Sequence, residues 1–217
     1  MIRPLSDGRR RLLALLAALP LLAACGREAP RLAAIPAGAT VLALGDSLTA
    51  GVGATAGESW PTLLAEASGW QLVNAGVSGD TAPQALERLP ALLAEHAPAL
   101  VIVSIGGNDM LRRADAASIR ATIADICRRA QASGAQVVLV GVPQPTLLSA
   151  AAGRLRDHPL YAELADELKL PLYAGGWSEV LSDPTLRADT IHANAAGYAR
   201  FTAGLTAFLR ERGLLQS

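Results

Sequence analysis

Leu100-Val101-Ile102-Val103 and Val137-Val138-Leu139-Val140 are continuous apolar runs with no polar residue at alternate positions. A strand with one face in water alternates apolar and polar side chains, so these unbroken runs indicate strands that are covered on both faces. Both faces are covered when the strands are parallel and helices connect them on either side. The two segments therefore predict an α/β protein with a buried parallel sheet.

Strand-like and helix-like segments alternate along the chain, which is the pattern of a three-layer α/β/α domain. We expect strands at Thr40–Leu44, Gln71–Asn74, Leu100–Ile105, Gln136–Val142 and Leu170–Tyr173. We expect helices at Ser59–Ser68, Ala82–Glu95, Ser118–Ser133, Leu160–Lys169 and Ala195–Arg212. Thr81 and Gln84 have the spacing of a capping box, and Gly134 stands where a helix would end in a left-handed cap.

The composition excludes several classes of protein. The chain has 217 residues, of which 51% are hydrophobic, so it can form one domain with a sizeable core and is not disordered. Lys+Arg and Asp+Glu both number 19, so no basic face for nucleic acid is expected. Histidines and carboxylates are too sparse to suggest a metal site. We expect a monomer that needs no metal or other cofactor.

The first residues have the pattern of a targeting segment. Arg9-Arg10-Arg11 is basic, and Leu12 to Leu22 is an apolar stretch too short to span a bilayer comfortably. Leu22-Ala23-Ala24-Cys25-Gly26 resembles the lipobox of bacterial lipoproteins, which implies cleavage before Cys25 and lipidation of its sulfur. An ordinary signal peptide cut nearby is the alternative.

These features predict three parts of the chain. Residues 1–24 form a signal peptide, 25–38 a lipidated N-terminus and tether, and 39–217 the folded domain. The expected location is the bacterial cell envelope, on a membrane and facing the periplasm. Gly26 rather than aspartate after Cys25 favours the outer membrane. If Cys25 is lipidated, Cys127 has no disulfide partner, and its neighbours at helical spacing predict a small buried hydrophobe.

Three polar turns follow the first three predicted strands. Ser47 lies in Gly45-Asp46-Ser47-Leu48, Gly79 in Val77-Ser78-Gly79-Asp80, and Asn108 in Gly106-Gly107-Asn108-Asp109. Ligands of open α/β sheets bind at the carboxyl ends of the strands, so these residues are expected at one site. A hydroxyl, an unobstructed backbone amide and a side-chain amide are the groups that acyl transfer needs.

A serine nucleophile also needs a base, and the chain has three histidines. His96 lies near a helix end, and His158 lies in a loop that we expect to be exposed. His192 lies in Asp189-Thr190-Ile191-His192, where one turn lets the carboxylate meet the imidazole and orient it. Asp-x-x-His alone would favour a structural role as a helix cap. In the company of Ser47, Gly79 and Asn108, we interpret it as catalytic.

These blocks resemble the SGNH, or GDSL, hydrolase superfamily over about residues 40 to 209. The chain is particularly similar to the periplasmic multifunctional type that acts as thioesterase, arylesterase and lysophospholipase. The resemblance implies a flavodoxin-like sheet of about five parallel strands. It implies Ser47 as nucleophile, His192 as base and Asp189 as orienting acid. It also implies an oxyanion hole formed by the amides of Ser47 and Gly79 and the side chain of Asn108.

Other residues in these blocks have structural interpretations. Many relatives have proline after the catalytic histidine, where this chain has Ala193; the change loosens a turn and removes no catalytic group. Asp46 is expected to brace the serine turn by a hydrogen bond. Asp80 and Asp109 are interpreted as residues that begin turns or helices.

The predicted function is a metal-independent serine esterase with ester or thioester substrates. Pro143–Ser149 follows the fourth strand, so its leucines, Leu147 and Leu148, are expected to line an acyl pocket. An O-acetyl esterase or acyltransferase acting on envelope polysaccharide would use the same residues. A membrane-tethered lipoprotein with an inert site is the alternative from another class.

Overall fold

The computed structural model describes residues 32–144 and 154–216. The sheet has five parallel strands in the order β2-β1-β3-β4-β5, with the first strand in the interior. Its strands are β1 (Thr40–Gly45), β2 (Gln71–Gly76), β3 (Leu100–Ser104), β4 (Gln136–Val140) and β5 (Leu172–Tyr173). This order is that of a flavodoxin-like sheet, as expected.

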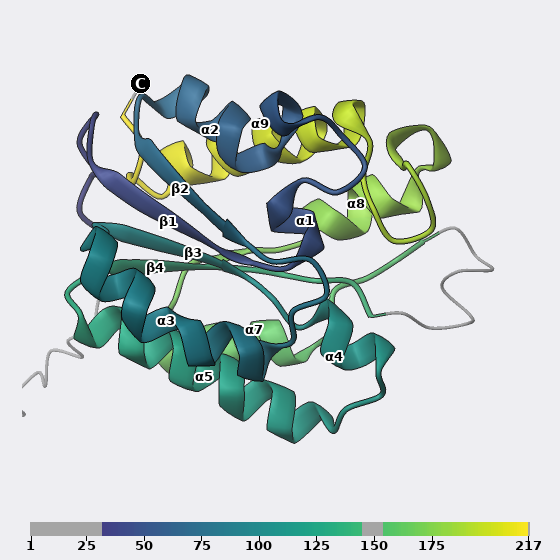
Figure 1. The fold of residues 1–217 in the computed structure, drawn as a ribbon, viewed down its shortest axis with the longest axis horizontal. Helices are drawn as coiled ribbons and strands as arrows, with labels where there is room; N and C mark the ends of the chain where they lie inside the picture. The colour runs from purple at the N-terminus through teal and green to yellow at the C-terminus, as the bar shows by residue number, and fades with distance from the viewer. Residues whose placement is uncertain (1–31, 145–153, 217) are drawn as a thin grey trace, which may run out of the picture. The chain divides into compact units, whose positions relative to one another are not determined.

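Helices cover both faces of the sheet (Figure 1). The α-helices are α1 (Ser47–Ala50), α2 (Trp60–Ser68), α3 (Ala82–His96), α4 (Gly107–Leu111), α5 (Ala116–Ala132), α7 (Leu160–Leu168), α8 (Gly176–Ser182) and α9 (Ala195–Glu211). Figure 1 shows α2, α8 and α9 on one face and α3, α5 and α7 on the other. The three-layer α/β/α prediction is confirmed.

Every strand and helix expected from the sequence is present, and no boundary differs by more than two residues. Three short helices were not expected, namely α1, α4 and α8. Each follows the carboxyl end of a strand and has at most seven residues, too few to show a helical pattern of apolar positions. The omission matters, because α1 begins with Ser47 and α4 contains Asn108.

The apolar strands lie at the centre of the core. All residues of β3 are buried, as are the last four of β4, which agrees with strands covered on both faces. On the α9 side, Trp177 stacks on Phe201 with ring centroids 3.7 Å apart. The indole of Trp177 also donates a hydrogen bond to the Ser104 hydroxyl at 3.1 Å, which joins α8 to the end of β3.

Residues 32–38 pack against the sheet and its helices. The backbone N–H of Ile35 donates to the carbonyl of Leu214, and the Trp70 indole donates to the carbonyl of Ile35. The compact unit accordingly begins at Leu32, within the segment expected to be a tether. The predicted signal peptide, Cys25, Leu147 and Leu148 lie outside the described residues. Within the described ranges, no helix is both long and apolar enough to cross a bilayer.

Candidate active site

The serine turn is a short helix held tightly against the sheet. Ser47 is the first residue of α1, and Asp46 caps that helix by accepting a hydrogen bond from the Leu48 N–H at 3.1 Å. A Cβ on Gly45 would clash with the Thr49 side chain of α1, and one on Gly76 would clash with the Ala50 backbone. Glycine at both positions therefore lets α1 lie directly on β1 and β2.

Asp46 is buried, so its carboxyl group is in an unusual environment. Burial raises its pKa to about 7, while the Leu48 hydrogen bond and the nearby His192 act to lower it. The brace predicted from the sequence is confirmed, but the side chain is also a titrating group beside the site. Nothing in the local sequence signals this burial, which involves residues distant along the chain such as Gly107, where a Cβ would lie 3.4 Å from the Asp46 Oδ2.

The structure joins Ser47, His192 and Asp189 in one line of hydrogen bonds. The His192 Nε2 lies 3.0 Å from the Ser47 Oγ, and its Nδ1 lies 2.7 Å from the Asp189 Oδ2. The other carboxylate oxygen of Asp189 accepts hydrogen bonds from the backbone N–H groups of Ile191 and His192, both at 2.8 Å. The loop therefore fixes the carboxylate and the carboxylate fixes the ring.

Asp189 is held in its charged form. Desolvation is the largest single influence and acts to raise its pKa, but the hydrogen bonds from His192 and Ile191 together outweigh it and lower the pKa below its ordinary value. A charged acceptor at Nδ1 places the imidazole proton there, which leaves Nε2 free to accept the proton of Ser47. This arrangement suits a general base.

The other two histidines lie elsewhere. His96 ends α3 and lies 3.8 Å from Glu95. His158 is half-buried rather than exposed, because its Nδ1 accepts a hydrogen bond from the N–H of Leu160 at the start of α7. This local hydrogen bond, which the sequence does not indicate, holds the imidazole ring of His158 close to the backbone.

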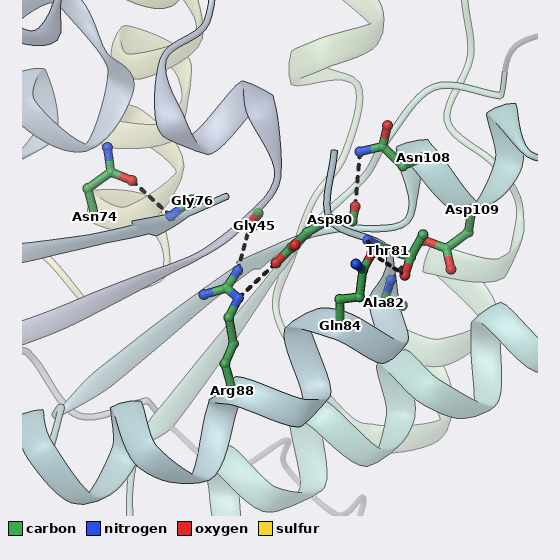
Figure 2. Close-up of polar contacts among 10 residues, drawn as sticks. All are labelled: Gly45, Asn74, Gly76, Asp80, Thr81, Ala82, Gln84, Arg88, Asn108 and Asp109. Atoms are coloured by element: carbon green, nitrogen blue, oxygen red, sulfur yellow. Dashed lines mark hydrogen bonds and ion pairs between the residues drawn. The ribbon is translucent and has the colours of Figure 1, made fainter. Parts of the chain in front are cut away.

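Two of the three expected oxyanion donors, Gly79 and Asn108, lie on a turn and on the short helix α4, which contact each other. The Asn108 Nδ2 donates a hydrogen bond to the Asp80 carbonyl at 2.9 Å (Figure 2). Gly79 has φ +85°, and no atom lies within 4 Å of where a Cβ would be, so the space beside it is open. A primary amide carries two N–H bonds, so one remains on Asn108 for a ligand.

A cavity of about 460 Å³ opens beside Ser47 and Asn108. Its lining is mostly apolar and includes Met110, Leu111, Val142, Leu155, Leu181 and Ile191. Pro143 also lines it, in agreement with the expectation for the segment after β4. Such a cavity suits the hydrocarbon part of a substrate.

Two further groups near the site have roles that the sequence did not indicate. The Asp109 carboxylate accepts a hydrogen bond from the Ala82 N–H at 2.8 Å, so it caps the start of α3 from a different loop. Arg88 pairs with Asp80 at 2.8 Å.

Within 32–144 and 154–216, no cluster of three His, Cys, Asp or Glu could hold a metal ion. Cys127 is buried, as predicted, and burial raises its thiol pKa to about 12.

Comparison with known proteins finds one family. Residues 43–200 match the model of the GDSL-like lipase/acylhydrolase family. Esterase TesA of Pseudomonas aeruginosa is 42% identical over 111 residues, which span 49% of this chain and 55% of that esterase. Thioesterase 1/protease 1/lysophospholipase L1 of Escherichia coli K12 is 39% identical over 163 residues, 71% of this chain and 76% of that enzyme. A crystal structure of TesA superposes with a TM-score of 0.70 at 33% identity, covering 80% of this chain and 99% of that one.

Proposed function

This chain belongs to the GDSL-like lipase/acylhydrolase family and is an ester hydrolase of that family, and from this premise we propose that Ser47 is its nucleophile. His192 is the general base and Asp189 the acid that orients it. The observation that carries the proposal is the continuous line of hydrogen bonds from the Ser47 Oγ through the imidazole to the Asp189 carboxylate.

The reaction proceeds through an acyl-enzyme. As the Ser47 Oγ attacks the substrate carbonyl, its proton passes to the His192 Nε2, and the carbonyl oxygen becomes an oxyanion. The tetrahedral intermediate collapses when the bond to the alcohol or thiol breaks, and His192 returns the proton to that leaving group. Water then attacks the acyl group on Ser47 by the same steps, which releases the acid and restores the hydroxyl.

The oxyanion needs donors where its charge develops. We assign this role to the backbone N–H groups of Ser47 and Gly79 and to the free N–H of the Asn108 side chain. Asp189, whose pKa is lowered, remains ionised and stabilises the imidazolium that forms at His192. The donors and the carboxylate thus act on opposite charges of the same transition state.

We propose that the substrates are carboxylic esters or thioesters with an apolar acyl chain. The apolar cavity beside Ser47 supports this class over an O-acetyl esterase or acyltransferase on polysaccharide, which would need polar lining for sugar hydroxyls. Leu155→Trp narrows the cavity and should shift the preference toward shorter acyl chains in a panel of p-nitrophenyl esters. Faster turnover of an acetylated glycan than of every ester in the panel would contradict the proposal.

We propose that the enzyme works in the cell envelope on a membrane anchor. The support is the sequence of residues 1–26, with its basic start, short apolar stretch and lipobox-like ending at Cys25. More than one acyl chain is needed for stable anchoring, and lipoprotein processing adds more than one. The Cys25→Ser variant should move from the detergent phase to the aqueous phase in a two-phase extraction. Retention of the variant in the detergent phase would exclude lipidation at this residue.

Labelling with a fluorophosphonate probe tests the enzyme proposal. Wild type should be labelled on Ser47, and Ser47→Ala and His192→Ala should abolish labelling. The matched control is Ser78→Ala, which removes an exposed serine hydroxyl one residue before Gly79 and should be labelled like wild type. If correctly folded wild type is not labelled, the proposal that Ser47 is a nucleophile fails.

A further inference from the structure

Arg88 joins the serine turn to the loop that carries Gly79, although it does not line the cavity. It lies on α3, and its Nε donates to the Asp80 carboxylate at 2.8 Å while its Nη2 donates to the Gly45 carbonyl at 2.9 Å (Figure 2). Only 23% of the Arg88 side chain and 10% of the Asp80 side chain is exposed. An ion pair this sheltered is weakly screened by solvent and constrains both partners.

Both ends of the four-residue turn 77–80 are attached to one acceptor, the Gly45 carbonyl. The N–H of Val77 donates to that oxygen directly at 3.1 Å, and Asp80 is attached to it through the Arg88 guanidinium. The turn itself closes with a hydrogen bond from the Asp80 N–H to the Val77 carbonyl. Arg88 therefore helps to place Gly79 relative to the end of β1, together with Arg112, whose Nη2 donates to the Gly79 carbonyl at 3.0 Å.

The same arrangement extends to Asn108 on α4. The Asp80 carbonyl accepts a hydrogen bond from the Asn108 amide at 2.9 Å, so the residue that Arg88 holds through its carboxylate also orients Asn108 (Figure 2). One N–H of that amide is directed at Asp80, and this fixes the direction of the other. A shift of Asp80 would move both Gly79 and Asn108.

We infer that Arg88 is a positioning residue for the oxyanion hole, an inference that rests on the function proposed above for Ser47, Gly79 and Asn108. It sets the distance between the serine turn and the other two oxyanion donors, Gly79 and Asn108. Loss of Arg88 should therefore weaken stabilisation of the transition state, because donors displaced by about 1 Å bind the oxyanion much less well. Substrate binding should change little, because the apolar cavity stays intact.

The role requires arginine rather than any cation. The guanidinium is planar and carries donors in a fixed fork, so it reaches a carboxylate and a carbonyl at the same time with defined geometry. A lysine at this position keeps the charge but concentrates its donors on one atom. Arg88→Lys is therefore expected to keep the fold and lose part of the positioning.

The test measures kcat and KM on p-nitrophenyl butyrate for wild type, Arg88→Lys and Arg88→Met. We expect kcat to fall roughly 10- to 100-fold in Arg88→Met and less in Arg88→Lys, with KM changed less than about threefold. Arg129→Met is the matched control. It removes an exposed arginine of α5 that pairs with Asp125 of the same helix, away from the site. That variant should retain wild-type kcat.

A double-mutant cycle with Asn108→Ala separates positioning from a general structural effect. If Arg88 acts through the oxyanion donors, its removal costs much less in the Asn108→Ala background than in wild type. Losses that multiply fully, or a folded Arg88→Met with unchanged kcat, would overturn the inference. If Arg88→Met does not fold, the same cycle is run with Arg88→Lys and judged by the same criteria.

Failure of this inference can be told apart from failure of the proposed function. The fluorophosphonate probe reports whether wild type has a reactive Ser47 at all. A labelled wild type with Arg88 variants that behave like Arg129→Met removes only the positioning role. An unlabelled wild type removes the proposed function and, with it, the inference.

Discussion

The Nε2 of His192 lies 3.0 Å from the Oγ of Ser47 across a separation of 145 residues. Ser47 is placed by the end of β1, and His192 is placed by the loop before α9. Backbone hydrogen bonds hold that loop: the Ala188 N–H donates to the His192 carbonyl, and Ala193 pairs with Arg187. These bonds hold the shape of the loop with alanine at position 193.

Asp189→Asn should lower kcat by roughly 10²- to 10⁴-fold while the protein stays folded. Asparagine retains one oxygen for the backbone N–H groups of Ile191 and His192, but its amide cannot hold the proton on the His192 Nδ1 or stabilise the imidazolium. Steady-state kinetics on a p-nitrophenyl ester measures the effect, and circular dichroism checks the fold. Asp183→Asn, which changes an exposed aspartate that caps a separate turn, is the control. A kcat within about twofold of wild type would show that Asp189 does not orient the base.

Most of this architecture could be predicted from the sequence because its determinants are local. The buried runs of β3 and β4 predicted a sheet covered on both faces, and the turns after the first three strands predicted one edge for Ser47, Gly79 and Asn108. Ligands of a parallel sheet collect at that edge for topological reasons, so no distance information was needed.

The parts that could not be predicted depend on contacts between distant segments. Arg88 contacts the carbonyl of Gly45, 43 residues away, and no spacing rule links a helix arginine to the end of an earlier strand. The burial of Asp46 likewise involves a residue distant along the chain, Gly107 at the start of α4. The short helices α1 and α4 were not predicted, because four or five residues are too few to show the helical repeat of apolar positions.

Asn108→Ala should reduce kcat about 10²- to 10³-fold with a small change in KM, because the lost N–H acts on the oxyanion rather than on the bound substrate. Steady-state kinetics on the same ester checks this. Asn108→Asp should be at least as impaired, since a carboxylate would repel the developing negative charge. A raised KM with an unchanged kcat would instead indicate that Asn108 binds the substrate in the ground state as strongly as in the transition state.

Gly76→Ala should destabilise the domain by about 1–3 kcal/mol and also lower activity. The added Cβ would meet the backbone of Ala50 at the end of α1, so relief requires a shift of the helix that begins with Ser47. Gly57→Ala is the control, because its Cβ would meet nothing within 4 Å and its φ is not positive. Urea unfolding and esterase assays measure the two effects. A Gly76→Ala protein as stable and as active as Gly57→Ala would show that α1 tolerates displacement from β2.

Asp46→Asn should change how stability depends on pH. Burial raises the pKa of Asp46 to about 7 in the folded protein, whereas in the unfolded chain an aspartate has a pKa near 3.9. Between these values the folded state retains a proton that the unfolded state has lost. The free energy of unfolding therefore falls as pH rises through this window, by up to about 1.4 kcal/mol per pH unit from this group.

Asparagine cannot ionise, yet it keeps an oxygen for the Leu48 N–H, so the variant lacks this one contribution. Urea denaturation at pH 5 and pH 8 should show a smaller loss of unfolding free energy in Asp46→Asn than in wild type. The difference between the two slopes is the quantity to compare, because the other titrating groups are the same in both proteins and their contributions cancel. Asp115→Asn, which alters the exposed cap of α5, should keep the wild-type slope. Identical slopes in Asp46→Asn and wild type would mean that Asp46 is ionised in the folded protein throughout this range.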